Sequence, residues 1–138
     1  MRKVSFFLLY IMLLTTVVHA NGNTSNSTKP TRENILEDAT LDLLQPQITS
    51  AIEDYYGTTF NIGFYCQKII SIKKLEHPGS MLIEAKLEGV TYKGAHNPID
   101  IFTITVKKDQ STEGKWVMQE YKVKKFRKNE KYECRDPA

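Results

Sequence analysis

The hydrophobic positions of this 138-residue chain divide it into a leader, a helical segment and a segment of strands. Residues 4–18 form an uncharged, mostly apolar run that follows Arg2 and Lys3. A basic start, a short apolar run and small residues at the cleavage position are typical of a secretory signal peptide over residues 1–20, so we expect cleavage between Ala20 and Asn21. A retained membrane anchor is the alternative, but this run is shorter than the roughly 20 residues that span a bilayer.

The helical segment begins after a polar leader. Residues 21–30 are small and polar, which predicts a flexible leader ahead of one domain over residues 31–138. From Thr31, apolar residues recur at helical spacing: Ile35, Leu36, Ala39, Leu43 and Leu44, then Ile48, Ala51, Ile52 and Tyr55. Pro46 interrupts the pattern, which leaves two helical pieces or one kinked amphipathic helix that ends at Gly57.

After Thr58 the apolar period changes from about 3.6 residues to two, which is typical of strands. The predicted strands cover residues 65–75, 81–88, 99–107 and 115–126. Short polar turns join them, so we expect an antiparallel meander. The sequence therefore predicts an α+β fold, with an N-terminal kinked helix packed on a four-stranded antiparallel meander sheet. By analogy the shape is cystatin-like, which fixes no function.

The only cysteines are Cys66 and Cys134. In an exported chain an even number of cysteines favours one intramolecular disulfide. This bond would close a loop of 68 residues, from 66 to 134, and would stabilise the fold by about 4 kcal/mol. The chain after Phe126 is long enough to cross under the sheet to the first strand. The alternative is a free, reactive thiol with a histidine partner.

Charge is balanced overall but unevenly placed. Two of the 19 Lys and Arg residues, Arg2 and Lys3, lie in the predicted signal peptide. The remaining 17 stand against 16 Asp and Glu, and this near-zero net charge argues against nucleic-acid binding. Residues 31–57 are acidic, with Arg32 the only base. The C-terminal region is basic: Lys122, Lys124, Lys125, Arg127, Lys128 and Lys131. This stretch could bind an anionic wall polymer, or its lysines could be a solvated strand edge.

Candidate chemistry is sparse. The sequence has no metal-ligand spacing of His or Cys, no Gly-x-Ser-x-Gly motif and no phosphate-binding glycine loop, so we expect no catalytic residue, metal or cofactor. His96 and Asn97 lie in the loop that enters the third strand, where an imidazole could exchange protons. Tyr55 and Tyr56 could join this loop from the helix end. The alternative is a structural turn and packed tyrosines.

The side of the sheet that does not face the helix is a further candidate surface. If Phe102, Val117 and Tyr121 face the helix, then Ile101, Trp116 and Met118 face the other way. One helix covers only one side of a sheet. An exposed patch of these three residues would fit a partner protein or a homodimer.

Four short segments, which form two separate motifs, resemble a known family. The segments Leu43–Pro46, Ala51–Gly57, Gly94–Pro98 and Thr103–Val106 resemble domain-of-unknown-function family 3888, small exported proteins of spore-forming Gram-positive bacteria. The resemblance covers about residues 36–125. It implies export from a bacterial host and no assigned activity.

We therefore expect a secreted or cell-envelope-associated protein with no membrane-spanning segment after cleavage. The leading hypothesis is a non-catalytic binding or inhibitory module that acts on an unknown extracellular protein. A cell-envelope protein that binds anionic wall polymer through its basic C-terminal region is the first alternative. A small hydrolase that uses His96 is the second.

Overall fold

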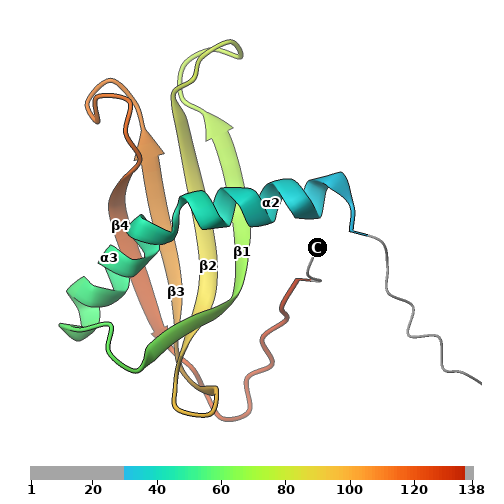
Figure 1. The fold of residues 1–138 in the computed structure, drawn as a ribbon, viewed down its shortest axis with the longest axis vertical. Helices are drawn as coiled ribbons and strands as arrows, with labels where there is room; N and C mark the ends of the chain where they lie inside the picture. The colour runs from blue at the N-terminus through green and yellow to red at the C-terminus, as the bar shows by residue number, and fades with distance from the viewer. Residues whose placement is uncertain (1–29, 136–138) are drawn as a thin grey trace, which may run out of the picture.

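Two helices lie across one face of a four-stranded antiparallel sheet (Figure 1). The computed structural model describes residues 30–135, so the predicted signal peptide, its cleavage between Ala20 and Asn21 and most of the polar leader lie outside the described residues. The elements are α2 (Arg32–Leu43), α3 (Gln45–Tyr56), β1 (Ile62–Lys74), β2 (Ile83–Lys93), β3 (Asn97–Lys108) and β4 (Val117–Lys125). The sheet order is β1-β2-β3-β4. The predicted α+β class and antiparallel meander are confirmed.

The helical segment forms two helices, which is one of the two alternatives that the sequence left open; the other was one kinked helix. The Thr31 side chain caps α2 by accepting a hydrogen bond from the backbone N–H of Asn34 (3.1 Å). The break falls at Leu44, because Pro46 has no N–H to continue the ladder and is well suited to the first turn of a new helix. Gly57 ends α3 in a left-handed conformation (φ 71°). Neither helix is long and apolar enough to cross a membrane, and no other helix occurs within residues 30–135.

The hydrophobic core lies between the helices and the inner face of the sheet. The buried helical residues follow one stripe that continues through the break: Leu41, Leu44, Ile48, Ala51 and Ile52. They pack on the buried residues of the two central strands: Ala85, Leu87, Phe102, Ile104 and Val106. The predicted inward positions of α3 up to Ile52 are confirmed, whereas Tyr55 is partly exposed.

The predicted buried face of α2 is largely wrong. Ile35, Leu36 and Leu43 are 52%, 54% and 59% exposed, whereas Leu41 is buried. The buried stripe of α3 fixes the rotation of α2 about its axis. The stripe continues from Ile48 to Leu44 and, three residues earlier, to Leu41, so the Leu41 side of α2 must face the sheet. The other apolar side chains of α2 consequently point away from the sheet.

The predicted patch of Ile101, Trp116 and Met118 is also wrong. The register of β3 and β4 shifts between Thr105 and Val106, so that Gln119 is an extra residue in β4. A bulge of one residue moves the following side chains to the other face. Trp116 and Met118 therefore pack against the core on the helix side, while Ile101 is buried on the opposite face.

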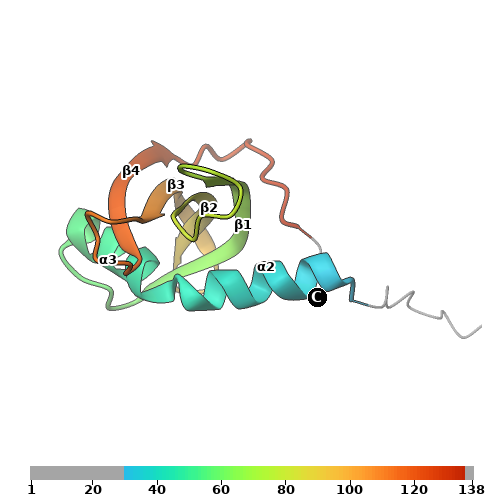
Figure 2. The same cartoon turned by 90° about the horizontal axis from the view of Figure 1, so that it is seen from above.

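That opposite face is partly covered by residues 126–135, which we call the C-terminal strap. Figure 2 shows the strap on the side of the sheet away from the helices before it turns round the β1 edge. Tyr132 lies near the sheet, with its ring centroid 4.6 Å from the Lys68 ammonium. Beneath this region, Val90 and Ile101 are buried. The sheet thus carries helices on one face and the strap on the other.

Two neighbouring leucines test the rotation of α2. We expect Leu44→Ala to lower the free energy of unfolding by about 3 kcal/mol, because it opens a cavity in the core. Leu43→Ala removes the same atoms from an exposed position and should cost less than about 0.5 kcal/mol. Urea unfolding of the two variants measures both values, and equal losses would contradict the assigned rotation.

Candidate functional site

A buried polar cluster joins the end of α3 to three strands. The Tyr56 hydroxyl donates a hydrogen bond to Oδ2 of Asp100 (2.6 Å) and lies 2.8 Å from Oγ1 of Thr91. The Lys125 ammonium lies 3.0 Å from Oδ1 of Asp100. The side chains of Asp100 and Thr91 are fully buried. The cluster therefore compensates a buried carboxylate with one phenol and one largely exposed cation.

The electrostatics of this cluster favour a structural role. Burial, followed by the hydrogen bond to Asp100, raises the pKa of Tyr56 well above its usual range. A phenol with a raised pKa holds its proton at neutral pH, so Tyr56 acts as a donor and not as a base. The hydrogen bond to Asp100 likewise raises the pKa of Lys125. The contacts of Tyr56 thus fix the end of α3 against the sheet, and Lys125 joins β4 to Asp100 of β3.

Tyr55 belongs to the same helix end but packs at the surface. Its ring makes edge-on contacts with Tyr56, Phe102 and Tyr121, at centroid distances of 4.8, 5.4 and 6.3 Å. The Tyr121 hydroxyl in turn donates a hydrogen bond to Asp54 (2.7 Å). These contacts place Tyr55 in an aromatic cluster at the rim of the core.

His96 and Asn97 lie at the turn between β2 and β3, and the structure does not bring them to the helix end. The His96 ring stacks on Tyr92 at 4.6 Å, and Tyr65 meets Tyr92 edge-on at 5.2 Å. These rings lie on the strap side of the sheet, opposite the face that carries Tyr56. Asn97 is the exposed first residue of β3. His96 is thus an exposed turn residue supported by aromatic stacking.

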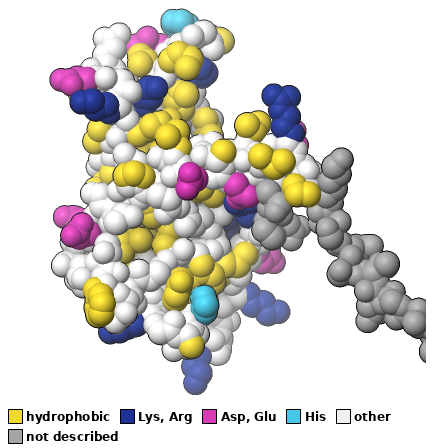
Figure 3. All heavy atoms as spheres, viewed as in Figure 1, with side chains coloured by type: hydrophobic (Ala, Val, Ile, Leu, Met, Phe, Trp, Pro, Cys, Tyr) yellow, Lys and Arg dark blue, Asp and Glu magenta, His cyan; other side chains and the backbone are white. Residues whose placement is uncertain are grey.

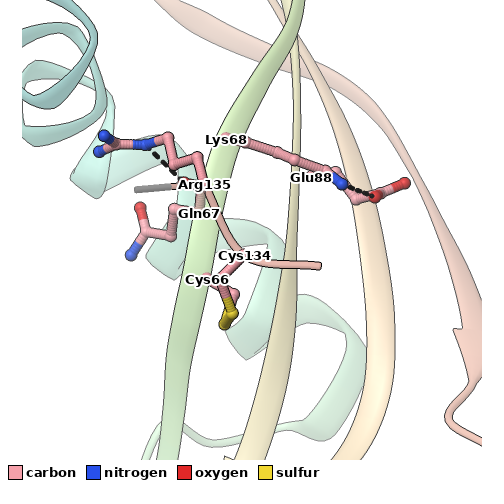
Figure 4. The surroundings of a disulfide bond; sticks show 6 residues. All are labelled: Cys66, Gln67, Lys68, Glu88, Cys134 and Arg135. Carbon is pink, nitrogen blue, oxygen red and sulfur yellow. Dashed lines mark hydrogen bonds and ion pairs between the residues drawn. A yellow bond between two sulfur atoms is a disulfide. The ribbon is translucent and has the colours of Figure 1, made fainter. Parts of the chain in front are cut away.

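Cys66 and Cys134, the pair predicted to form a disulfide, lie together, with their sulfur atoms at bonding distance and their Cα atoms 4.7 Å apart (Figure 4). Cys66 lies in a bulge of β1 and has a left-handed backbone (φ 52°). The bond fastens the C-terminal strap to the first strand. No free cysteine occurs in residues 30–135, so the alternative of a reactive thiol is not supported there.

Arg135 links the end of the strap to both β1 and α2. Its Nε donates a hydrogen bond to the backbone carbonyl of Gln67 (3.0 Å), as Figure 4 shows. Its guanidinium also forms ion pairs with Asp38 and Glu37 of α2. Glu37 in turn accepts a hydrogen bond from the backbone N–H of Ile69 (2.6 Å). An open hollow of about 580 Å³ lies beside this junction, between α2, β1 and the disulfide.

α2 exposes apolar side chains on the face that points away from the core. We define Ile35, Leu36 and Leu43 as the α2 outer surface. Figure 3 shows hydrophobic and acidic side chains close together along this helix. The apolar spacing was visible in the sequence, but the direction in which these residues point was not.

Two further residues were not identified from the sequence. Asp100 carries a recognisable signal, because it is the lone acidic residue of β3 and stands between Ile99 and Ile101. Arg135 carries none, because its partners come from a helix and a strand that are distant in the chain.

The basic C-terminal region is only partly neutralised. Lys124 pairs with Glu130, and Lys125 pairs with Asp100. The remaining members of the predicted basic stretch are exposed: Lys122, Arg127, Lys128 and Lys131. Among residues 30–135, no group of three or more His, Cys, Asp or Glu side chains is arranged to hold a metal ion.

Comparison with known proteins identifies the family. A family model described as "Protein of unknown function (DUF3888)" matches residues 36–128. This chain belongs to the DUF3888 family. The DUF3888 match begins inside α2, covers the whole sheet and ends near the start of the strap, so Cys66 lies within it and Cys134 beyond it. No curated protein and no solved structure matched the chain.

A first test of this DUF3888 protein concerns the polar cluster. Tyr56→Phe should lower the free energy of unfolding by about 1–3 kcal/mol at pH 7, because the buried carboxylate of Asp100 loses the phenol donor and keeps only Lys125. Tyr55→Phe is the matched control and should change stability by less than about 0.5 kcal/mol. Urea unfolding of both variants measures these values.

The same variant has a defined pH dependence. Because the folded-state pKa of Tyr56 lies above the unfolded value of 10.0, its contribution is complete below pH 10 and declines as the pH rises above it. Unfolding measured between pH 8 and pH 11 should therefore show a shallower alkaline loss for Tyr56→Phe than for the wild type. An identical slope would contradict the assignment.

A second test concerns the strap. The double variant Cys66→Ser/Cys134→Ser should lower the free energy of unfolding by up to about 4 kcal/mol, because the unfolded chain regains the freedom of a 68-residue loop. Arg135→Gln keeps the bond, removes the partly exposed ion pairs and should cost no more than about 1 kcal/mol. Thermal unfolding followed by circular dichroism compares the two. A stability of the double variant equal to the wild type would exclude a stapling role.

Proposed function

We propose that this protein is an exported, non-catalytic module that binds or inhibits a partner protein through the α2 outer surface. The observation that carries the proposal is the exposure of Ile35, Leu36 and Leu43 on one helix. Single apolar residues are common on protein surfaces, but a helix that is apolar on its core side and again on its solvent side is typical of a docking element. This surface replaces the patch of Ile101, Trp116 and Met118 that the sequence indicated.

The proposed site of action is outside the cytoplasm, in the medium or at the cell envelope. Two independent features support it. The first 20 residues have the pattern of a secretory signal. The Cys66–Cys134 pair is at disulfide distance, and such bonds form and persist mainly in oxidising compartments.

A second candidate function is binding of an anionic wall polymer. The observation that favours it is the set of exposed basic side chains on β4 and the strap: Lys122, Arg127, Lys128 and Lys131. Binding of this kind is dominated by charge and weakens steeply as salt is added. The apolar contact of the α2 outer surface does not weaken in this way when salt is added.

Envelope binding separates the two functions. Labelled protein is incubated with envelopes of the producing cells, with and without prior protease treatment of the envelopes. We expect the double variant Leu36→Ser/Leu43→Ser to lose about tenfold or more in affinity, and protease treatment to remove the binding of the wild type. Phe60→Ser removes an exposed apolar side chain from the loop between α3 and β1 and is the matched control.

Three results would contradict the proposal. Wild-type affinity of the leucine variant would exclude the α2 outer surface. Binding that survives protease treatment and falls steeply between 50 and 300 mM salt would favour the wall polymer. Hydrolysis of an envelope component that is lost in His96→Ala would favour an enzyme.

A further inference from the structure

The α2 outer surface has acidic residues on both of its sides. At about 100° per residue, Leu36 and Leu43 lie almost in line along the helix. Glu33 lies roughly 70° from that line on one side and Asp42 roughly 110° on the other. Both carboxylates belong to exposed residues. Arg32 lies roughly 30° from the same line, so the charges around the stripe are one positive and two negative.

The rest of the helical face strengthens the negative field. Arg32 is the single basic residue in α2 and α3, against six acidic residues: Glu33, Glu37, Asp38, Asp42, Glu53 and Asp54. Arg135 neutralises Glu37 and Asp38 from the strap. The border of the stripe itself, Glu33 and Asp42, has no basic partner among the ion pairs within residues 30–135.

This charge distinguishes between the possible occupants of the surface. Amphipathic helices that lie on anionic membranes carry several lysines and arginines beside the apolar face, whereas α2 carries four carboxylates and one arginine. A symmetric dimer through α2 would bring together two helices that each carry four carboxylates and one arginine, and contact between like net charges is unfavourable. A partner with basic residues beside apolar ones avoids the electrostatic repulsion that an anionic membrane or a second copy of α2 would meet.

We infer that the α2 outer surface docks a cationic amphipathic segment of a partner protein, with its apolar side chains on Leu36 and Leu43 and its Lys or Arg residues beside Glu33 and Asp42. This inference rests on the proposed binding function and adds the chemistry of the partner. The apolar contact supplies the affinity, and the carboxylates select against neutral and acidic segments.

Two synthetic helical peptides test the inference on the purified protein. Both carry leucines at i, i+3, i+4 and i+7. One has lysine at every polar position and the other has glutamate. Fluorescence anisotropy measures their affinities at 50 and 300 mM salt. We expect the lysine peptide to bind at least about tenfold more tightly than the glutamate peptide at 50 mM salt, and this difference to shrink at 300 mM.

Substitutions separate the apolar and charged parts of the site. The double variant Leu36→Ser/Leu43→Ser should lose most affinity for the lysine peptide, whereas Phe60→Ser should keep it. The double variant Glu33→Gln/Asp42→Asn should weaken binding of the lysine peptide several-fold and flatten its salt dependence. Circular dichroism and thermal unfolding show that each variant is folded, which is expected because all of the substituted residues are exposed.

Each contrary result has a distinct meaning. If both peptides bind equally and the leucine variant binds neither, the docking surface stands and the cationic partner is excluded. If the leucine variant binds the lysine peptide as the wild type does, the α2 outer surface and the proposed function both fail. If sedimentation shows a wild-type dimer that the leucine variant does not form, a second copy occupies the surface and the inference is overturned.

Discussion

The packing of one continuous apolar stripe against the sheet determines most of this structure. Leu44 lies at the break between the helices and is fully buried, so the stripe passes from Ile48 to Leu41 without interruption. Burial of these side chains supplies most of the driving force for docking both helices. It also removes any freedom in the rotation of α2. The outward direction of Leu36 and Leu43 is thus a consequence of how the core closes, and the candidate binding surface depends on it.

The two faces of the sheet are completed by different kinds of interaction. The helix side is closed by apolar contacts and by the cluster around Asp100. The other side is closed by the strap, which the Cys66–Cys134 bond and the contacts of Arg135 hold in place. Because Arg135 also pairs with Asp38, the end of the strap and the first helix are joined. The two coverings of the sheet therefore support each other at the β1 edge.

The sequence was sufficient for the element types, the meander and the cysteine pair, because these follow from the apolar period, the turn residues and the presence of just two cysteines. It was insufficient wherever a single residue determines which side chains of an element face the core. The break at Leu44 set the rotation of α2, and the extra residue Gln119 reversed the faces of Trp116 and Met118. Neither effect appears in the apolar period itself. The polar cluster was missed for a related reason, since Asp100 and Tyr56 meet only after the helix has docked.

The covalent link between Cys66 and Cys134 also determines how the protein responds to mechanical load. Tension applied between residue 30 and residue 135 passes directly from one sulfur to the other, because the bond bypasses residues 67–133. Most of the sheet is therefore shielded from a pulling force, and only the helices and the first residues of β1 bear it. A molecule tethered by one end and loaded at the other would extend by its helical segment while the strands stay paired.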